Sequence, residues 1–266
     1  MPVPHNTLLT ALAMTTLAGL STGLGGLLVL WLQPGQRAVA GALGFAAGVM
    51  LTVSFADLLP AGLAFYREWF GSALAAGSAA ASMLLCGMAL AGLMGRCLPE
   101  PAALLPAAQG TAPPDRVLAL RCGLTVGLAL VLHNLPEGVL TLFAGVGDPR
   151  TGLRLTLAIA LHNLPEGIGV AAPLWYATRS RSKSAAAAFL SGLAEPVGAL
   201  AAWGLLRGVL SAALLNGLCL TAAGVMVWVS VEELLFGGFR LGQKGPVCAG
   251  FGLGTAVMTL GIAVLA

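Results

Sequence analysis

The chain has 266 residues, of which 58% are hydrophobic and 9% are charged, and its formal net charge is +3. A soluble domain carries roughly 25% charged residues, so this composition excludes a water-soluble globular protein. The basic residues stand singly or in small groups between apolar runs, which excludes a nucleic-acid-binding surface. We therefore predict an all-α integral membrane protein with a single transmembrane domain over residues 1–266.

Eight apolar segments are long enough to cross a bilayer, which takes about 20 residues. In chain order the predicted spans are 8–32, 39–63, 72–95, 118–144, 153–176, 184–206, 211–236 and 246–266. Polar or Gly- and Pro-rich segments separate them, such as Tyr66-Arg67-Glu68 after the second span. The longest connection is a Pro- and Ala-rich loop at about 97–116, which we expect in the cytoplasm. The first span lacks a basic leader, so we expect it to be retained as a helix.

The distribution of Lys and Arg predicts the orientation, because short cytoplasmic loops are enriched in these residues. The segments after spans one, three, five and seven contain nine of them: Arg37, Arg96, Arg116, Arg121, Arg179, Arg181, Lys183, Arg240 and Lys244. The opposite side contains four: Arg67, Arg150, Arg154 and Arg207. We therefore predict a multi-pass protein of the inner (plasma) membrane with both termini outside the cytoplasm.

Acidic residues occur where a lipid bilayer disfavours them. Six of the ten fall inside predicted spans or near their ends: Asp57, Glu137, Glu166, Glu195, Glu232 and Glu233. A charge at the bilayer centre costs roughly 3 kcal/mol or more, so such residues normally face a pathway. No Lys or Arg lies in mid-span to neutralise them, so they must be protonated or bind a cation. Asp57 fits either a site at the end of that pathway or an interfacial position, and Glu232 and Glu233 fit a solvated helix end equally well.

One seven-residue string, L-H-N-L-P-E-G, occurs at 132–138 and again at 161–167. Its His and Glu are four residues apart and project from one helix face. Its Pro lacks an N–H and kinks the helix, and its Gly permits close helix contact. In antiparallel fourth and fifth spans, the two strings bring together two imidazoles, two carboxylates and two amides. Imidazole nitrogen and carboxylate oxygen suit zinc and other first-row ions, and two carboxylates can bridge a pair of ions.

Two further patterns complete the set of candidate residues. Glu195 precedes Pro196 in the middle of the sixth span, so a proline kink would open the helix beside this carboxylate. It is a further candidate ligand, or else a protonated group that hydrogen-bonds between helices. The five cysteines are scattered and form no C-x-x-C pair, so we interpret them as apolar filler.

These strings, together with V-A-A-P-L at 170–174 and S-G-L-A-E-P at 191–196, resemble the ZIP family of divalent metal transporters (Zrt/Irt-like proteins). The resemblance covers nearly the whole chain and is nearest to the bacterial broad-specificity members. It implies eight helices in a 3+2+3 arrangement with inverted repeats, an elevator-like movement, uptake of metal into the cytoplasm, and a homodimer.

The resemblance also implies a binuclear transport site. The first ion would use His133, Glu137, His162 and Glu166, and the second Asn134, Asn163 and Glu195, with Glu137 and Glu166 bridging the two. Zinc is the first expected substrate, and iron, manganese, cobalt and cadmium are compatible with the same ligands. No catalytic cofactor is expected. The loop at 97–116 contains no His, unlike that of many members, and Asn163 stands where some members carry Asp, which leaves the metal preference open.

Two other functions compete with a carrier. An intramembrane metal-dependent hydrolase usually needs H-E-x-x-H or an open coordination position with a general base, and no H-E-x-x-H occurs. A cation channel would use the same acids but give poorly saturable flux. No G-x-x-x-x-G-K-[ST] occurs, so ATP is not the expected driver, while proton coupling and passive carriage both stay open.

Overall fold

The computed structural model describes residues 4–98, 113–206 and 208–265, and every element in these ranges is helical. The α-helices are α1 (His5–Leu32), α2 (Gln36–Val53), α3 (Leu59–Phe70), α4 (Ala73–Cys97), α5 (Pro114–Gly147), α6 (Pro149–Thr178), α7 (Arg181–Gly192), α8 (Ala194–Ala201), α9 (Ala212–Trp228), α10 (Phe236–Arg240) and α11 (Lys244–Leu265). Three π-helical segments interrupt them: η1 (Ser54–Leu58), η3 (Ala202–Leu206) and η4 (Val229–Leu235).

These elements form eight helical runs long and apolar enough to cross a membrane, which confirms the predicted number of spans in the described ranges. Most runs extend several residues beyond their predicted ends, and the second reaches from Gln36 to Phe70. The predicted break at Tyr66-Arg67-Glu68 is wrong, because α3 continues through it. The chain turns instead at Gly71, whose φ of 65° lies in the left-handed region that glycine adopts without strain.

The connection predicted at about 97–116 is partly described. Helix α4 ends at Cys97 and α5 begins at Pro114, close to the predicted ends of this connection. Residues 99–112 lie outside the described residues.

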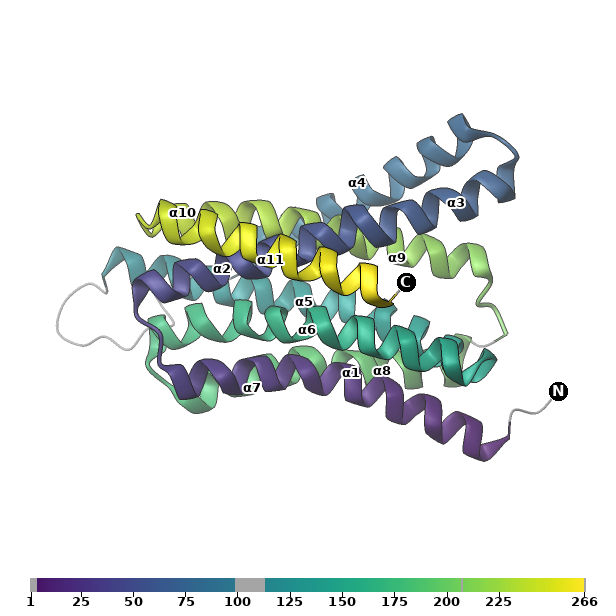
Figure 1. The fold of residues 1–266 in the computed structure, drawn as a ribbon, viewed down its shortest axis with the longest axis horizontal. Coiled ribbons are helices and arrows are strands. Elements are labelled where there is room, and N and C mark those ends of the chain that lie inside the picture. Colours follow the sequence, from purple (N-terminus) through teal and green to yellow (C-terminus); the bar gives the residue numbers. More distant parts are fainter. Residues whose placement is uncertain (1–3, 99–112, 207, 266) are drawn as a thin grey trace.

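The helices lie side by side along one long axis, with α5 and α6 in the middle of the bundle (Figure 1). Helix α1 packs on α6, and α8 packs on α5; α2 packs on α11, and α4 packs on α9. An inverted repeat relates spans one to three to spans six to eight, and span four to span five. Under this relation the α1–α6 contact corresponds to the α8–α5 contact, and the α2–α11 contact corresponds to the α9–α4 contact. The packing therefore follows the predicted 3+2+3 arrangement with inverted repeats.

A short sequence match accompanies this exchange. The string V-S-x-x-acid-L-L begins at Val53 in the second span and again at Val229 in the seventh, and both copies fold as π-helix. The acids are Asp57 and Glu233. A π-helical turn is rare and often marks a functional position, so the two copies identify corresponding points of the two repeats.

Large apolar side chains cover the outside of the bundle. Trp31, Leu74 and Leu205 are 84%, 82% and 81% exposed, although each belongs to a candidate span. Such a surface is stable against lipid tails and would aggregate in water. We call the end of the bundle with the start of α1 and the α5–α6 turn the terminus end, and the end with the α1–α2 and α6–α7 connections the loop end (Figure 1).

Candidate metal centre

The tight turn between α5 and α6 makes the two copies of the repeated string antiparallel neighbours. Asp148 caps α6, because its carboxylate accepts hydrogen bonds from the backbone N–H groups of Arg150 and Thr151 at 3.3 and 3.0 Å. Pro149 follows at the first helical position, where its fixed φ suits a helix start. Both helices then continue through Pro136 and Pro165, so neither proline ends its helix.

The two strings meet crosswise at the centre of the bundle. His133 Nε2 lies 3.2 Å from Glu166 Oε1, and His162 Nε2 lies 3.4 Å from Glu137 Oε1. Each His therefore faces the Glu of the other string, although its own Glu lies one turn away on the same helix. Since the helices are antiparallel, each contact has a counterpart related by approximate twofold symmetry.

The two motif asparagines tie this pair to neighbouring helices. Asn134 Nδ2 donates to the carbonyl oxygen of Ser191 at 3.0 Å, and Asn163 Nδ2 donates to that of Ala18 at 3.0 Å. Asn163 Nδ2 also donates to Glu195 Oε1. Because both amides use their nitrogen for these bonds, both amide oxygens are left for another partner.

Glu195 reaches the centre because the sixth span is broken beside it. Helix α7 ends at Gly192 and α8 begins at Ala194, so the opening predicted near Glu195 is confirmed. Its carboxylate is fully buried and lies against Asn163. The structure therefore brings Glu195 to the residues of the two strings.

The motif glycines set how closely the helices approach. A Cβ built at Gly138 would lie 2.0 Å from the carbonyl oxygen of Glu195, and one at Gly167 would lie 1.8 Å from that of Thr22. No real side chain fits at such distances, so any larger residue would push α8 or α1 away from the centre. This confirms the close helix contact predicted for the motif glycine.

Every predicted ligand carries one buried atom that lacks a partner. Eleven buried side-chain nitrogen or oxygen atoms in the described residues have no hydrogen-bond partner. Seven of these belong one each to the seven candidates: His133 Nδ1, Asn134 Oδ1, Glu137 Oε2, His162 Nε2, Asn163 Oδ1, Glu166 Oε2 and Glu195 Oε2. Leaving one such group unpaired costs about 1–3 kcal/mol, so a cluster of seven calls for water or an ion.

The four His and Glu side chains of the two strings form two His–Glu pairs and do not form a complete coordination sphere for one ion. Within the described residues, no three His, Cys, Asp or Glu side chains are placed to hold one metal ion together. Each imidazole instead faces one carboxylate. An ion that enters would replace these contacts with its own bonds to the unpartnered nitrogen and oxygen atoms.

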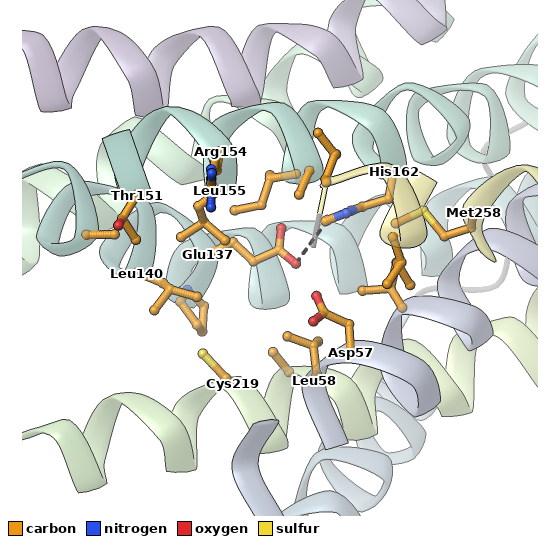
Figure 2. Close-up of a pocket in the computed structure, with 18 residues that line it drawn as sticks. Asp57, Leu58, Glu137, Leu140, Thr151, Arg154, Leu155, His162, Cys219 and Met258 are labelled. Atoms are coloured by element: carbon orange, nitrogen blue, oxygen red, sulfur yellow. Dashed lines mark ion pairs between the residues drawn. The ribbon is translucent and has the colours of Figure 1, made fainter. Parts of the chain in front are cut away.

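A cavity of about 390 Å³ leads from this centre toward the terminus end. Figure 2 shows Glu137 and His162 on one side of it and Asp57 on the other. The lining of α6 continues from His162 through Arg154 to Thr151 in the first turns of the helix. The sequence left the role of Asp57 open, and the structure places it on this route.

At the loop end, α5 contacts η4 and α6 contacts α2. Cys122 of α5 donates a hydrogen bond through Sγ to the carbonyl oxygen of Glu233 at 3.2 Å. A Cβ built at Gly169 of α6 would lie 3.1 Å from the Cβ of Ala46 in α2. Glu232 lies away from the centre and pairs with Arg240 at 2.7 Å. Neither Glu232 nor Glu233 lines the cavity, so these two acids are not brought to the predicted ligands.

Sequence reasoning missed two cavity residues with sulfur side chains. Cys219 of α9 and Met258 of α11 both line the cavity, whereas from the sequence we interpreted the cysteines as apolar filler and did not single out Met258. Nothing in the local sequence distinguishes them, because their position depends on how α9 and α11 face α5 and α6.

The chain is similar to known zinc transporters over nearly its whole length. A family model described as "ZIP Zinc transporter" matches residues 110–265. Zinc transporter ZupT of Corynebacterium glutamicum is 41% identical over 264 residues, which cover 96% of this chain and 98% of that protein. Zinc transporter ZupT of Chlorobium limicola is 39% identical, covering 96% and 98% of the two chains. Zinc transporter ZupT of Xanthomonas axonopodis pv. citri is 39% identical, covering 98% and 97%.

Proposed function

Because the chain belongs to the ZIP zinc transporter family, we propose that it carries divalent metal ions, zinc first, across the membrane through the centre between α5, α6 and α8. The family and the names of the relatives describe transporters and not enzymes. We assign the ion to the seven residues that the sequence singled out: His133, Asn134, Glu137, His162, Asn163, Glu166 and Glu195.

One observation carries this assignment. All seven side chains are buried, and each retains one unpartnered nitrogen or oxygen atom. Such a cluster destabilises a protein that has no use for it. Imidazole, carboxylate and amide groups are the ligands that zinc and other first-row ions accept. Two carboxylates, Glu137 and Glu166, lie among these groups and suit the bridging role in a binuclear site.

The cavity and the charges support uptake from outside into the cytoplasm. The cavity reaches the centre from the terminus end, and the loop end is packed. Nine of the thirteen Lys and Arg residues flank the loop end of the predicted spans, which favours a cytoplasmic loop end. The ion would enter from outside, displace the His–Glu contacts and neutralise the carboxylates. Neutralisation lowers the cost of burying these groups and favours the state open to the cytoplasm.

A carrier explains the packed loop end better than a channel does. Flux through a channel needs a continuous path, whereas a carrier is open to one side at a time. We extend the proposal to zinc, iron, manganese, cobalt and cadmium as substrates, to the inner membrane, and to a homodimer as the assembly. A homodimer is testable by mass measurement in detergent, where a monomer of 26.7 kDa would contradict it.

The decisive experiment is metal uptake into proteoliposomes. Wild-type protein should take up radioactive zinc with saturable kinetics, and the variant His133→Ala/Glu166→Ala should fall to the level of empty liposomes. Glu68→Gln is the matched control, because Glu68 is an acid near the terminus end that does not line the cavity. Full uptake by the folded double variant would refute the site, and non-saturable zinc flux in the wild type would favour a channel.

A further inference from the structure

The cavity lies between two walls that differ in their chemistry. Helices α5 and α6 form one wall, which presents the oxygen of Glu137 and the nitrogen of His162 (Figure 2). Segments η1, α9 and α11 form the other, which presents Asp57, Cys219 and Met258. The second wall thus adds two sulfur atoms to the oxygen and nitrogen ligands of the first.

The thiol of Cys219 is available to a ligand. Cys219 is partly exposed, and in the described ranges its side chain makes no hydrogen bond. Cys122 differs, because it is buried and donates to the carbonyl oxygen of Glu233. Cys86, Cys97 and Cys248 are exposed but do not line the cavity. Cys219 is therefore the cysteine that an ion in this cavity meets.

The opposite wall carries polar groups that suit a cation. Glu137 and His162 are 5% and 4% exposed and both line the cavity. Glu137 Oε2 has no hydrogen-bond partner, and Glu137 Oε1 lies 3.4 Å from His162 Nε2. Among the described residues these groups and Cys219 do not converge on one point. A contact between the thiol and an ion would therefore be made on the way to the His162–Glu137 pair, and not within a fixed cluster.

We propose that Cys219, supported by Met258, biases this carrier toward thiophilic divalent ions, so that cadmium and zinc are favoured over manganese and iron. The proposal rests on the transport function proposed above. Thiolate and thioether sulfur prefer soft and borderline ions, whereas carboxylates and water suit manganese. On contact the thiol forms a sulfur–metal bond and its proton passes to water in the cavity.

The first test is competition between cadmium and manganese for uptake into proteoliposomes. Cys219→Ser should lower the preference for cadmium over manganese about tenfold, because a hydroxyl is a harder ligand than a thiolate. Met258→Leu should lower it about two- to threefold, since a thioether is a weaker ligand. Cys86→Ser and Met226→Leu are matched controls, an exposed cysteine and a buried core methionine outside the cavity, and should leave the ratio unchanged. An unchanged ratio in Cys219→Ser overturns the proposal.

The second test does not depend on transport. Purified protein in which the exposed Cys86, Cys97 and Cys248 are replaced by Ser should develop the ultraviolet cadmium–thiolate absorption band when cadmium is added, and the further change Cys219→Ser should remove it. A band that survives this change overturns the proposal. If the band depends on Cys219 but wild-type protein takes up no metal, the thiol contact stands and the transport function fails. If uptake is normal and the band is absent, the transport function stands and the role of Cys219 fails.

Discussion

The two ends of the interface between α5–α6 and the helices of spans two, seven and eight differ sharply. At the terminus end a cavity of about 390 Å³ separates the two groups and exposes Asp57 and Cys219. At the loop end the two groups of helices are in contact. Cys122 donates a hydrogen bond to the backbone carbonyl of Glu233, and Leu130 and Leu234 belong to one buried apolar cluster. Cys122 lies about 16 Å along α5 from His133, so the closed region is three turns long.

Under the proposed carrier mechanism, this interface would open at one end at a time. At the loop end Leu130 and Leu234 belong to the buried apolar core, while Glu137 and His162 line the cavity. The repeated V-S-x-x-acid-L-L string places Asp57 in the open half and Glu233 in the closed half. Opening the loop end would therefore require the side chain of Cys122 and the backbone of Glu233 to separate.

The largest effect is expected from filling the open end. Ala158 of α6 lines the cavity, so Ala158→Phe should block the route and reduce zinc uptake at least about tenfold while the protein stays folded. The same change at the closed end, Ala46→Phe, has no space to occupy and should destabilise the protein by about 1–3 kcal/mol or more. Uptake and thermal unfolding in detergent measure the two outcomes. Normal uptake by Ala158→Phe would remove the cavity from the transport route.

Native thiols at the two ends offer the next test. In a variant that lacks the three exposed cysteines, a water-soluble thiol reagent should modify Cys219 at least about tenfold faster than Cys122, because Cys122 is buried. Zinc should protect Cys219 by occupying the centre next to it. Peptide mass spectrometry gives the two rates. Faster modification of Cys122 would mean that the protein rests open at the loop end.

A substitution at the close helix contact in the centre is expected to have a smaller effect than the changes above. Gly138→Ala places a methyl group 2.0 Å from the carbonyl oxygen of Glu195, so it should destabilise the protein by about 1–3 kcal/mol and displace Glu195. Gly77→Ala in α4 is the control, because nothing lies within 4 Å of its added Cβ. That change should be neutral or stabilise the helix by up to about 1 kcal/mol. Equal unfolding temperatures for the two variants would argue against the close contact.

The smallest effect is expected from the ion pair at the loop end. Arg240 and Glu232 are 2.7 Å apart but 53% and 37% exposed, and water screens such a pair. Arg240→Gln should change the free energy of unfolding by less than about 1 kcal/mol and the uptake rate by less than about twofold. A large gain in the accessibility of Cys122 to a water-soluble thiol reagent in this variant would instead show that the pair holds the loop end closed.

Much of this molecule follows from local sequence. Runs of about 20 apolar residues identify all eight spans, since a bilayer leaves few alternatives for such segments. The spacing of His and Glu in the repeated string predicts which side chains share a helix face, and the structure buries all seven candidates. Gly138 and Gly167 are at the predicted close contacts. The wrong break at Tyr66-Arg67-Glu68 has a simple cause, because polar residues at a membrane surface do not need to end a helix.

Other features depend on how the helices are rotated and placed. Periodicity assigns a side chain to a face of its own helix, but it does not say which helix that face meets. The crosswise contacts of His133 with Glu166 and of His162 with Glu137 come from the antiparallel pairing of α5 and α6. The position of Cys219 beside the cavity comes from packing of α9 against span two. The sequence by itself determined the spans and the residues of the candidate metal site, and only the tertiary structure decided which end is open, because a cavity is a relation between helices and not a property of any one of them.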